Sequence, residues 1–470
     1  MDRRTFSLED QRRFADLSGD ANPVHVDPIA ARRLLFGGPV VHGMHTVFWL
    51  LDAWLKDVSR PIVLERCKAQ FRQHVAIGDE VIARQEGRSD ASIRLLAESA
   101  TGVAASLRIE WTASDTKMRQ FEYAKPVAEP CRVLDFEQAI HASGEVALGY
   151  DRAQLASLLA RIERFVPAHQ VATLLAATRI VGMRCPGFHS LFAGFELRFE
   201  ASEPATQLRY RVARHDPRFR ALELELEGMG MSGRLDALHR PAPAQQAQAV
   251  AISSRLPRDS FAGQRALVIG GSRGLGEVAA KLLALGGAEV RLTYHSGHPD
   301  ALRVVEEIRS AGASAACFRL DVLDASHGIM AGLADGWRPN ALHYFATPHI
   351  RGGGQVFSPE LFRRFCDHYV TGFAMLIDAL RALGSPLERV LYPSSVYVDE
   401  PPPELAEYAA AKAAGEVLCA GLERSGAVRI VQRPRLPRLA TDQTISLLGD
   451  AAPDPVPVLL AVLRALWTTP

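Results

Sequence analysis

The segment 265–294, RALVIGGSRGLGEVAAKLLALGGAEVRLTY, constrains the possible folds of this chain more than any other stretch. It reads as a buried strand, a glycine-rich turn, a helix and a second strand, which is the opening of a doubly wound parallel α/β sheet. Glycine lets a backbone approach a pyrophosphate, and the N-terminus of the following helix favours its negative charge. The sequence therefore predicts one α/β domain over residues 265–470.

The sequence before this domain has a different organisation. Pro, Ala and Gln replace regular periodicity in residues 241–264, which predicts a linker. A helical stretch followed by strand-like runs predicts an α+β layout for residues 1–115. The segment ATRIVGMRCPG weakly echoes GGPVVHGM, so residues 130–240 are expected to form a second, non-catalytic copy.

The composition excludes several classes of function. The formal net charge is +1 and no long run of Lys or Arg occurs, which argues against a nucleic-acid partner or an anionic membrane surface. The six cysteines contain no C-x-x-C pair, so neither a zinc site nor a disulfide framework is expected. No apolar run reaches the length of a membrane span, and the N-terminus has no signal-peptide core. We expect a cytoplasmic protein.

A first group of reactive residues lies in SGDANPVHVD, where Asp20 and His25 flank an Asn-Pro turn. A carboxylate and an imidazole that converge on one water can act as base and acid while protons move on and off carbon and oxygen. Gly43 in VVHGM precedes a helix, where an exposed N–H can bind a developing oxyanion. Each residue alone also has a structural explanation: a helix cap, a satisfied loop carbonyl and a permissive turn. His42 and His45 have i,i+3 spacing but no nearby third ligand, so no metal site is predicted.

The segments FADLSGDANPVHVDP and FGGPVVHGM resemble the MaoC-like (R)-specific enoyl-thioester hydratases and dehydratases over roughly the first 110 residues. The resemblance implies a hotdog fold, with Asp20 and His25 as the catalytic pair and Gly43 as the oxyanion donor. It also implies substrates that are acyl thioesters of coenzyme A or acyl carrier protein. Double hotdogs with one degenerate half occur in the family, in agreement with the weak similarity between the two segments described above. Phe48 and Trp49, where some members carry a serine, suggest a reshaped acyl pocket.

A second group lies in YPSSVYVDEPPPELAEYAAAK, where Tyr408 and Lys412 are one helical turn apart and Ser395 comes thirteen positions before the tyrosine. A phenol needs a neighbouring cation to lower its pKa before it exchanges a proton near neutrality. The same spacing also occurs in ordinary amphipathic helices. Together with the glycine-rich turn, it favours a nucleotide-dependent enzyme.

Residues 265–470 resemble the short-chain dehydrogenase/reductases, which have a Rossmann-like fold. The resemblance makes Tyr408 the proton donor, Lys412 the residue that lowers its pKa and holds the ribose, and Ser395, or alternatively Ser394, the group that polarises the substrate oxygen. The second strand is followed by no acid before Asp300, which favours NADP(H) over NAD. The expected cofactor-binding residues are Gly270, Ser272, Arg273, Gly274, Gly276, Asp321 and Val322. Arg273 is expected to pair with the 2′-phosphate, and the last two to meet the adenine.

Three positions depart from the reductase pattern. YFATP, Tyr344 to Pro348, stands where the family has N-N-A-G, and Tyr369 stands where it has the helix asparagine of its proton relay. The segment RPRLPR around Pro434 replaces the usual P-G, and the customary final D-G-G strand is missing from the sequence. These differences place the proton relay and the usual dimer surface in question.

The two resemblances together predict consecutive reactions. NADPH reduces a 3-oxoacyl thioester to the (3R)-hydroxyacyl form, which the hotdog site dehydrates to the trans-2-enoyl thioester, as in fatty-acid or polyketide synthesis. One alternative keeps the hydratase and makes the reductase domain a nucleotide-binding or regulatory module. Another is a non-enzymatic scaffold that docks carrier proteins, and a third is a reductase for the enoyl double bond or an unrelated carbonyl. A homodimer is an expectation from the resemblance alone.

Overall fold

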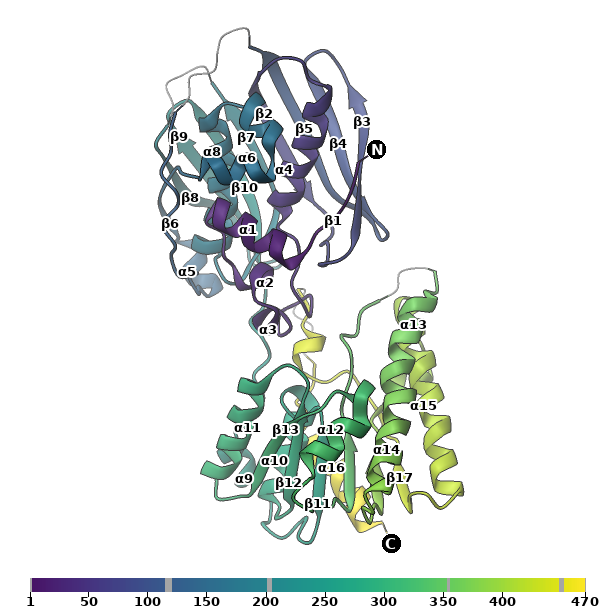
Figure 1. Ribbon diagram of the computed structural model, residues 1–470. Coiled ribbons are helices and arrows are strands. Elements are labelled where there is room, and N and C mark those ends of the chain that lie inside the picture. Colours follow the sequence, from purple (N-terminus) through teal and green to yellow (C-terminus); the bar gives the residue numbers. More distant parts are fainter. Residues whose placement is uncertain (1, 115–120, 201–204, 353–355, 448–451, 470) are drawn as a thin grey trace. The chain divides into compact units, whose positions relative to one another are not determined.

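The computed structural model describes residues 2–114, 121–200, 205–352, 356–447 and 452–469. The chain forms two compact units, the first mainly from Met1–Ala242 and the second mainly from Pro243–Ile445 (Figure 1). Within the described ranges, no helix is both long enough and apolar enough to cross a membrane.

One antiparallel sheet organises the first unit, with its strands in the order β1-β3-β4-β5-β2-β7-β10-β9-β8-β6. The strands are β1 (Arg3–Thr5), β2 (Ile62–Phe71), β3 (Glu80–Arg88), β4 (Ser92–Ser99), β5 (Gly102–Ala113), β6 (Ser143–Ala147), β7 (Ser190–Phe199), β8 (Gln207–Asp216), β9 (Ala221–Gly228) and β10 (Met231–His239). Leucines and glutamates alternate along β9, and the leucines are buried, which leaves the opposite face of the sheet polar.

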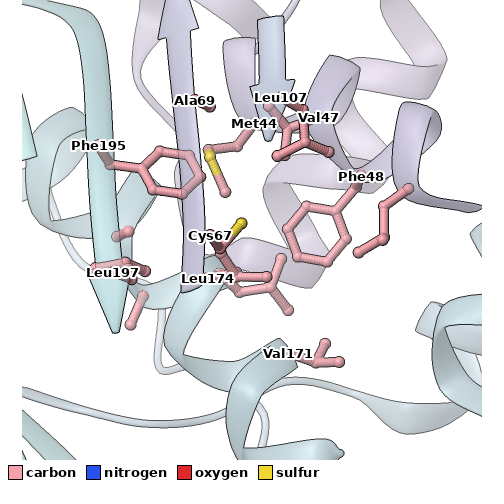
Figure 2. Close-up of a cluster of buried hydrophobic side chains, with 14 of the residues drawn as sticks. Met44, Val47, Phe48, Cys67, Ala69, Leu107, Val171, Leu174, Phe195 and Leu197 are labelled. Atoms are coloured by element: carbon pink, nitrogen blue, oxygen red, sulfur yellow. The ribbon is translucent and has the colours of Figure 1, made fainter. Parts of the chain in front are cut away.

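Helices cover the apolar face of this sheet. They are α1 (Leu8–Ser18), α2 (Pro23–Val26), α3 (Pro28–Ala31), α4 (Gly43–Trp54), α5 (Phe136–Ile140), α6 (Arg152–Leu158), α7 (Ala160–Phe165) and α8 (Ala168–Arg179). A 3₁₀ turn (Leu55–Asp57) follows α4, and a π-helical turn, η2 (Ile180–Arg184), follows α8. Side chains from α4, α8, β2, β5 and β7 meet in the core drawn in Figure 2. Two buried helices over the middle of the sheet therefore hold both halves of the unit together.

The two halves of the first unit repeat one order of elements. The first half runs β1, α4, β2, β3, β4, β5, and the second runs β6, α8, β7, β8, β9, β10. The strand order reads the same from either edge of the sheet, and β2 pairs with β7 where the halves meet. The α+β layout with an antiparallel sheet, predicted from the sequence, is confirmed.

A parallel sheet organises the second unit, with its strands in the order β13-β12-β11-β14-β15-β17. These are β11 (Arg265–Ile269), β12 (Glu289–Tyr294), β13 (Ala315–Arg319), β14 (Ala341–Tyr344), β15 (Arg389–Leu391) and β17 (Ile430–Gln432). The short strands β16 (Ser394–Ser395) and β18 (Arg435–Leu436) pair separately. The predicted parallel α/β sheet is confirmed, because every neighbouring pair in the larger sheet is parallel.

Helices cover both faces of the parallel sheet. One face carries α9 (Ala249–Ser253), α10 (Gly274–Leu285), α11 (His298–Ser310) and α16 (Pro455–Thr468). The other carries α12 (Ala325–Gly332), α13 (Pro359–Cys366), α14 (Phe373–Ala382) and α15 (Ala406–Arg424). Shorter turns complete the unit: η3 (Val322–Asp324), η4 (Asp367–Gly372), η5 (Val396–Val398), η6 (Pro403–Leu405) and η7 (Asp442–Thr444).

Part of the segment expected to be a linker packs onto the second unit. Helix α9 lies within residues 241–264 and contributes to the core beside α10. The buried Lys281 of α10 donates a hydrogen bond to the Ala247 carbonyl at 3.0 Å and pairs with Glu277 and Glu307. Buried charges are tolerated when they are paired in this way, so these contacts fix the segment to the unit.

Candidate active sites

Two helix caps shape the turn around Asp20. Helix α1 ends at Gly19, whose φ of 75° lies in the left-handed region that glycine adopts without strain. Asn22 caps α2, because its side-chain oxygen accepts a hydrogen bond from the Val24 N–H at 3.1 Å. The caps place Asp20 between the two helices and put His25 on α2.

The Asp20 carboxylate is buried among polar groups. The residue is 2 % exposed, and the hydroxyl of Thr178 donates to its Oδ2 at 2.6 Å. The Asn22 N–H donates to Oδ1 at 3.3 Å. Burial raises the pKa of Asp20, while His25, these two hydrogen bonds and Arg179 partly oppose the rise. Asp20 is thus a carboxyl group with a polar partner on each oxygen.

One hydrogen bond and one stacked ring orient His25. Its Nδ1 lies 2.8 Å from the Val40 carbonyl, which only accepts, so Nδ1 carries the proton and Nε2 keeps its lone pair. The ring stacks on His42 with the centroids 3.8 Å apart. Burial lowers the pKa of His25 to about 3, so the imidazole is neutral near pH 7. The site therefore holds a neutral proton acceptor beside the carboxyl group.

His42 braces this pair. Its Nε2 lies 2.9 Å from the Asp20 carbonyl, and its Nδ1 lies 3.0 Å from Oε1 of Gln11. Potential ligand atoms of Asp20, His25 and His42 lie within 4.8 Å of one another. Both nitrogens of His42 and one of His25 already lie within hydrogen-bond distance of oxygen atoms, so the arrangement fits proton transfer better than metal binding. His45, the i,i+3 partner of His42, stacks on a phenylalanine ring instead.

Gly43 is the first residue of α4 and directly follows His42. The first N–H groups of a helix have no acceptor within the helix and are suited to bind a carbonyl oxygen. A Cβ at Gly43 would lie 2.8 Å from the ring of Phe71, so the close packing here requires glycine. The structure brings Asp20 and His25 together and places Gly43 next to the ring stacked on His25.

Phe48 and Trp49, from which an altered acyl pocket was expected, both contribute to the core. Phe48 is fully buried and belongs to the cluster of Figure 2. Trp49 packs edge-on against Phe6 with the ring centroids 6.0 Å apart. Core packing explains both side chains, and the altered pocket has no support from their contacts.

The glycine-rich turn of the second unit joins β11 to α10. Gly270 has a φ of 75°, and α10 begins at Gly274. A Cβ at Gly276 would lie 2.2 Å from the Gly270 carbonyl oxygen, so the close contact between these two residues requires glycine at position 276. The Gly270 N–H donates to the Thr293 hydroxyl of β12 at 3.1 Å. The cradle and the helix N-terminus fit a dinucleotide pyrophosphate.

The other expected cofactor residues lie close in the fold to this turn. Ser272 is buried, and the guanidinium of Arg273 lies 3.6 Å from the Asp442 carboxylate. Asp321 follows β13 and caps the short turn in which the buried Val322 lies. Strands β11 and β13 are separated only by β12, and their carboxyl ends lie at the same edge of the parallel sheet.

Tyr408 on α15 meets one of the two adjacent serines of β16. A hydrogen bond with Ser395 lowers the pKa of Tyr408, but burial has the larger effect and raises it to about 12. The hydroxyl of Ser394 donates to Glu416. Ser395 is therefore the serine that contacts the tyrosine.

Lys412, one turn after Tyr408, is surrounded by aromatic rings. Its Nζ donates to the Pro393 carbonyl at 2.8 Å and lies 3.9 Å from the centre of the Tyr369 ring. The Tyr408 ring centre is 6.0 Å away. Burial lowers the pKa of Lys412 to about 7. For Tyr408, burial outweighs the hydrogen bond with Ser395, so its pKa is raised rather than lowered.

Tyrosines occupy the positions expected for asparagines. The Tyr369 hydroxyl lies 2.5 Å from that of Thr347, and the Tyr369 carbonyl accepts from the Tyr392 hydroxyl at 2.9 Å. The Tyr344 hydroxyl donates to the His368 carbonyl at 2.5 Å. These residues replace polar side chains by a buried aromatic cluster that faces Lys412.

Two family models match the chain in separate places. The model described as MaoC like domain matches residues 1–108, and the one described as short chain dehydrogenase matches residues 264–432. The chain joins a MaoC-like domain to a short-chain dehydrogenase domain.

Relatives of each domain are known. The MaoC-like domain is 37 % identical over 79 residues to a mitochondrial 3-hydroxyacyl-[acyl-carrier-protein] dehydratase of Arabidopsis thaliana, a match that covers 17 % of this chain and 47 % of that protein. The dehydrogenase domain is 41 % identical over 114 residues to a hydroxynaphthalene reductase-like protein, Arp2, of Metarhizium guizhouense, covering 24 % of this chain and 40 % of the relative. The chain thus spans less than half of each of these proteins.

Solved structures also resemble the second unit. A dehydrogenase/reductase from Sinorhizobium meliloti is 26 % identical with a TM-score of 0.40, covering 46 % of this chain and 91 % of that one. A 3-oxoacyl (acyl-carrier-protein) reductase from Agrobacterium tumefaciens with NADP bound is 20 % identical with a TM-score of 0.38, covering 44 % of this chain and 88 % of that one.

The MaoC-like site includes residues that sequence reasoning missed. Thr178 contacts Asp20 from 158 positions further along the chain. The side-chain amide of Asn22 donates to the carbonyls of Gly182 and Gly187 at 2.9 and 3.0 Å. In the sequence, only the weak similarity between the two halves pointed to this region. The region itself contains no reactive side chain of the expected type. Contacts between distant segments of this kind have no local signature in a single sequence.

Proposed function

We propose that the protein catalyses two consecutive steps on acyl thioesters. The dehydrogenase domain reduces a 3-oxoacyl thioester to the (3R)-hydroxyacyl form with NADPH, and the MaoC-like domain interconverts this product with the trans-2-enoyl thioester and water. The observation that carries the proposal is the pairing of the buried Asp20 with the half-buried His25, whose polar atoms lie within 4.8 Å of each other. The name of the Arabidopsis relative, an acyl-carrier-protein dehydratase, supports the thioester class.

In hydration, the ionised Asp20 carboxylate and the neutral Nε2 of His25 hold one water. As the water oxygen bonds to C3, Asp20 takes one of its protons and returns it to C2, so both side chains end as they began. The N–H of Gly43 binds the thioester oxygen as negative charge develops on it. Dehydration is the reverse sequence: Asp20 takes the proton from C2 and returns it to the departing hydroxyl. Both directions need Asp20 ionised and His25 neutral.

In the dehydrogenase domain, the residues present fit NADP(H). The glycine cradle and the α10 N-terminus would hold the pyrophosphate, and Arg273 would pair with the 2′-phosphate, since no acid follows β12 before Asp300. A bound NADPH supplies the hydride to the carbonyl carbon. Tyr408 donates the proton to the carbonyl oxygen, Ser395 holds that oxygen and Lys412 holds the ribose.

The proposal extends to architecture and partners. The repeated order of elements supports a double hotdog, with a catalytic half over residues 1–115 and a non-catalytic half over 130–240. The reductase follows over 265–470, and part of the segment expected to be a linker, 241–264, packs onto it. The substrate is an acyl chain on acyl carrier protein or coenzyme A.

One incubation tests both steps. The purified protein is mixed with NADPH and a 3-oxobutyryl thioester, on coenzyme A and on acyl carrier protein, and the acyl group is followed by intact mass. We expect a gain of two hydrogens followed by the loss of one water. A supplied (3R)-hydroxybutyryl thioester that loses no water, on either carrier, would reject the dehydratase.

A second candidate function retains only the hydratase. The enclosure of Lys412 by Pro393 and aromatic rings favours a dehydrogenase domain that binds the nucleotide without turning it over. NADPH binding without its oxidation, over a panel of 3-oxoacyl thioesters, would support this candidate and reject the reductase.

A further inference from the structure

We propose that the non-catalytic half of the MaoC-like unit completes the active site of the other half, with Thr178 as the positioning residue for Asp20 and Gly182 as the position that admits the Asp20 carboxylate. The inference rests on the proposed hydration chemistry. It gives functional roles to residues within 130–240, the half that was expected from the sequence to be non-catalytic.

Thr178 makes an unusual contact for a threonine near the end of a helix. A helical threonine commonly donates to the carbonyl four residues earlier, as Thr173 of the same helix does to His169 at 2.8 Å. Thr178 is 4 % exposed and donates to Oδ2 of Asp20 at 2.6 Å. A hydroxyl bonded to a buried carboxylate makes a charge-assisted hydrogen bond, which is stronger than a bond between neutral groups. Thr178 therefore fixes one oxygen of Asp20.

Gly182 lies in η2, where the helix widens into a π turn. A Cβ at this residue would lie 2.1 Å from Oδ1 of Asp20, far inside contact distance. Its carbonyl accepts hydrogen bonds from the Asn22 amide at 2.9 Å and from the Cys131 thiol at 3.1 Å. The missing side chain makes room for the carboxylate, and the carbonyl holds the residue that caps α2. π turns often occur at functional sites, in agreement with this role.

The loop after η2 supports the same contact. Gly187 accepts the second hydrogen bond of the Asn22 amide, at 3.0 Å. The fully buried Arg240 donates to the carbonyls of Phe188 and Ser190 and so ties this loop to the end of β10. Asp20 and Asn22 are thus held by residues of the second half.

The charged and titratable groups that face Asp20 set the expected pH effect. They are His25 from α2, His42 from the start of α4, Arg179 from α8 and Cys131 from the segment between the halves. Burial raises the pKa of Asp20, and the Thr178 hydrogen bond opposes this rise. Removing the hydroxyl raises the pKa further, so a smaller fraction of Asp20 is ionised at a given pH.

The full-length variants Thr178→Val, Thr178→Ser and Thr173→Val separate positioning from packing. With crotonyl thioester, Thr178→Val is expected to lower kcat by about 10- to 100-fold with KM within about twofold, and to move the acid limb of the rate profile up by about one pH unit. Thr178→Ser keeps the donor and restores most of the rate. Thr173→Val tests the loss of a buried hydroxyl that does not touch Asp20. Equal profiles for Thr178→Val and Thr173→Val would overturn the proposal.

Gly182→Ala gives a second test, with Gly87→Ala, whose Cβ would meet open space, as the control. We expect Gly182→Ala to lose hydration more severely than Thr178→Val and Gly87→Ala to keep it. Thermal unfolding of each variant reports whether the fold survives.

A readout independent of turnover keeps the two proposals apart. The carboxyl ¹³C signal of Asp20, assigned with Asp20→Asn, is titrated in wild type and in Thr178→Val. A higher midpoint in Thr178→Val supports the inference even if the wild type hydrates no enoyl thioester, a result that would reject the proposed function alone. An unchanged midpoint rejects the inference.

Discussion

The two candidate sites bury an ionisable group in opposite ways. Asp20 has a hydrogen-bond donor on each carboxylate oxygen, one from Thr178 and one from the Asn22 backbone. Lys412 has one hydrogen-bonded carbonyl, that of Pro393, and otherwise faces aromatic rings. Both groups lose their hydration, and Asp20 receives more hydrogen bonds in its place, although burial still raises its pKa.

This difference predicts different readiness for proton transfer. Hydrogen bonds to the charged form support an ionised Asp20, whereas rings supply only a weak cation–π attraction to an ammonium. Accordingly, the pKa of Lys412 falls to about 7 and that of Tyr408 rises to about 12. Asp20 therefore keeps two hydrogen bonds that favour its ionised form, whereas aromatic rings surround much of the Lys412 ammonium.

The largest expected effect comes from Asp20→Asn. The amide keeps the shape of the carboxylate but cannot take a proton, so hydration should fall by about 10³- to 10⁴-fold. Asp27→Asn is the matched control, because Asp27 is an exposed cap of α3 seven positions later and the amide oxygen can still accept its hydrogen bonds. Initial rates of crotonyl-thioester hydration measure the effect of each variant. NADPH binding should be unchanged in both variants, and a small effect of Asp20→Asn would remove it from the mechanism.

Tyr408→Phe tests the other side of the comparison. Without the phenol proton, reduction of a 3-oxoacyl thioester should fall by about 10²- to 10³-fold, while hydration stays at the wild-type rate. Ser395→Ala and Ser394→Ala form a pair that checks the neighbouring hydroxyl: only Ser395 contacts Tyr408, so only its loss should slow reduction strongly. NADPH oxidation followed at 340 nm measures all three. Equal effects of the two serine variants would contradict the geometry.

A smaller effect is expected from Gly43→Ala. The new methyl group would lie 2.8 Å from the Phe71 ring and shift the start of α4, so hydration should fall by about 10- to 100-fold although the N–H remains. Gly43→Ala combined with Phe71→Leu relieves the contact and should recover part of the rate. Failure of the double variant to recover would mean that the loss is not steric.

Local sequence sufficed for the parts of both sites that lie within a few residues. The Asn-Pro cap brings Asp20 to His25, and the glycine turn follows from a strand and a helix that the hydrophobic pattern reveals. In the first unit, the weak similarity between two segments of the sequence pointed to a repeat of elements. Gly43 begins α4, whereas Gly182 follows the end of α8, so the similar segments HGM and VGM do not occupy equivalent positions.

Contacts between distant segments explain what sequence did not predict. Thr178 is an ordinary helical residue until the fold places it beside Asp20, and nothing near Tyr408 and Lys412 in sequence shows that Tyr369 packs over the ammonium. The spacing of Tyr408 and Lys412 was read correctly as one helical turn. The pKa of each group also depends on burial created by other segments, which the spacing does not reveal.

The smallest expected effect compares two buried lysines of the second unit. Lys281 is paired with Glu277 and Glu307, whereas among the described residues the hydrogen-bond partner of Lys412 is the Pro393 carbonyl. Lys281→Met removes one of the two cations that pair with Glu277 and Glu307, the other being Arg303, and should lower the Tm. Lys412→Met removes a poorly solvated ammonium and should raise it by a few degrees.

The sign of the pH dependence makes this last comparison sharper. The pKa of Lys412 in the folded chain, about 7, is below its ordinary value, so between these values the unfolded chain binds a proton that the folded chain does not. The stability contributed by this group therefore falls as pH decreases toward 7 and stays low below it. The gain in Tm from Lys412→Met should be larger at pH 6 than at pH 9, as measured by calorimetry of the full chain. A gain independent of pH would show that Lys412 reaches a polar partner in solution, and the contrast between the two sites would then disappear.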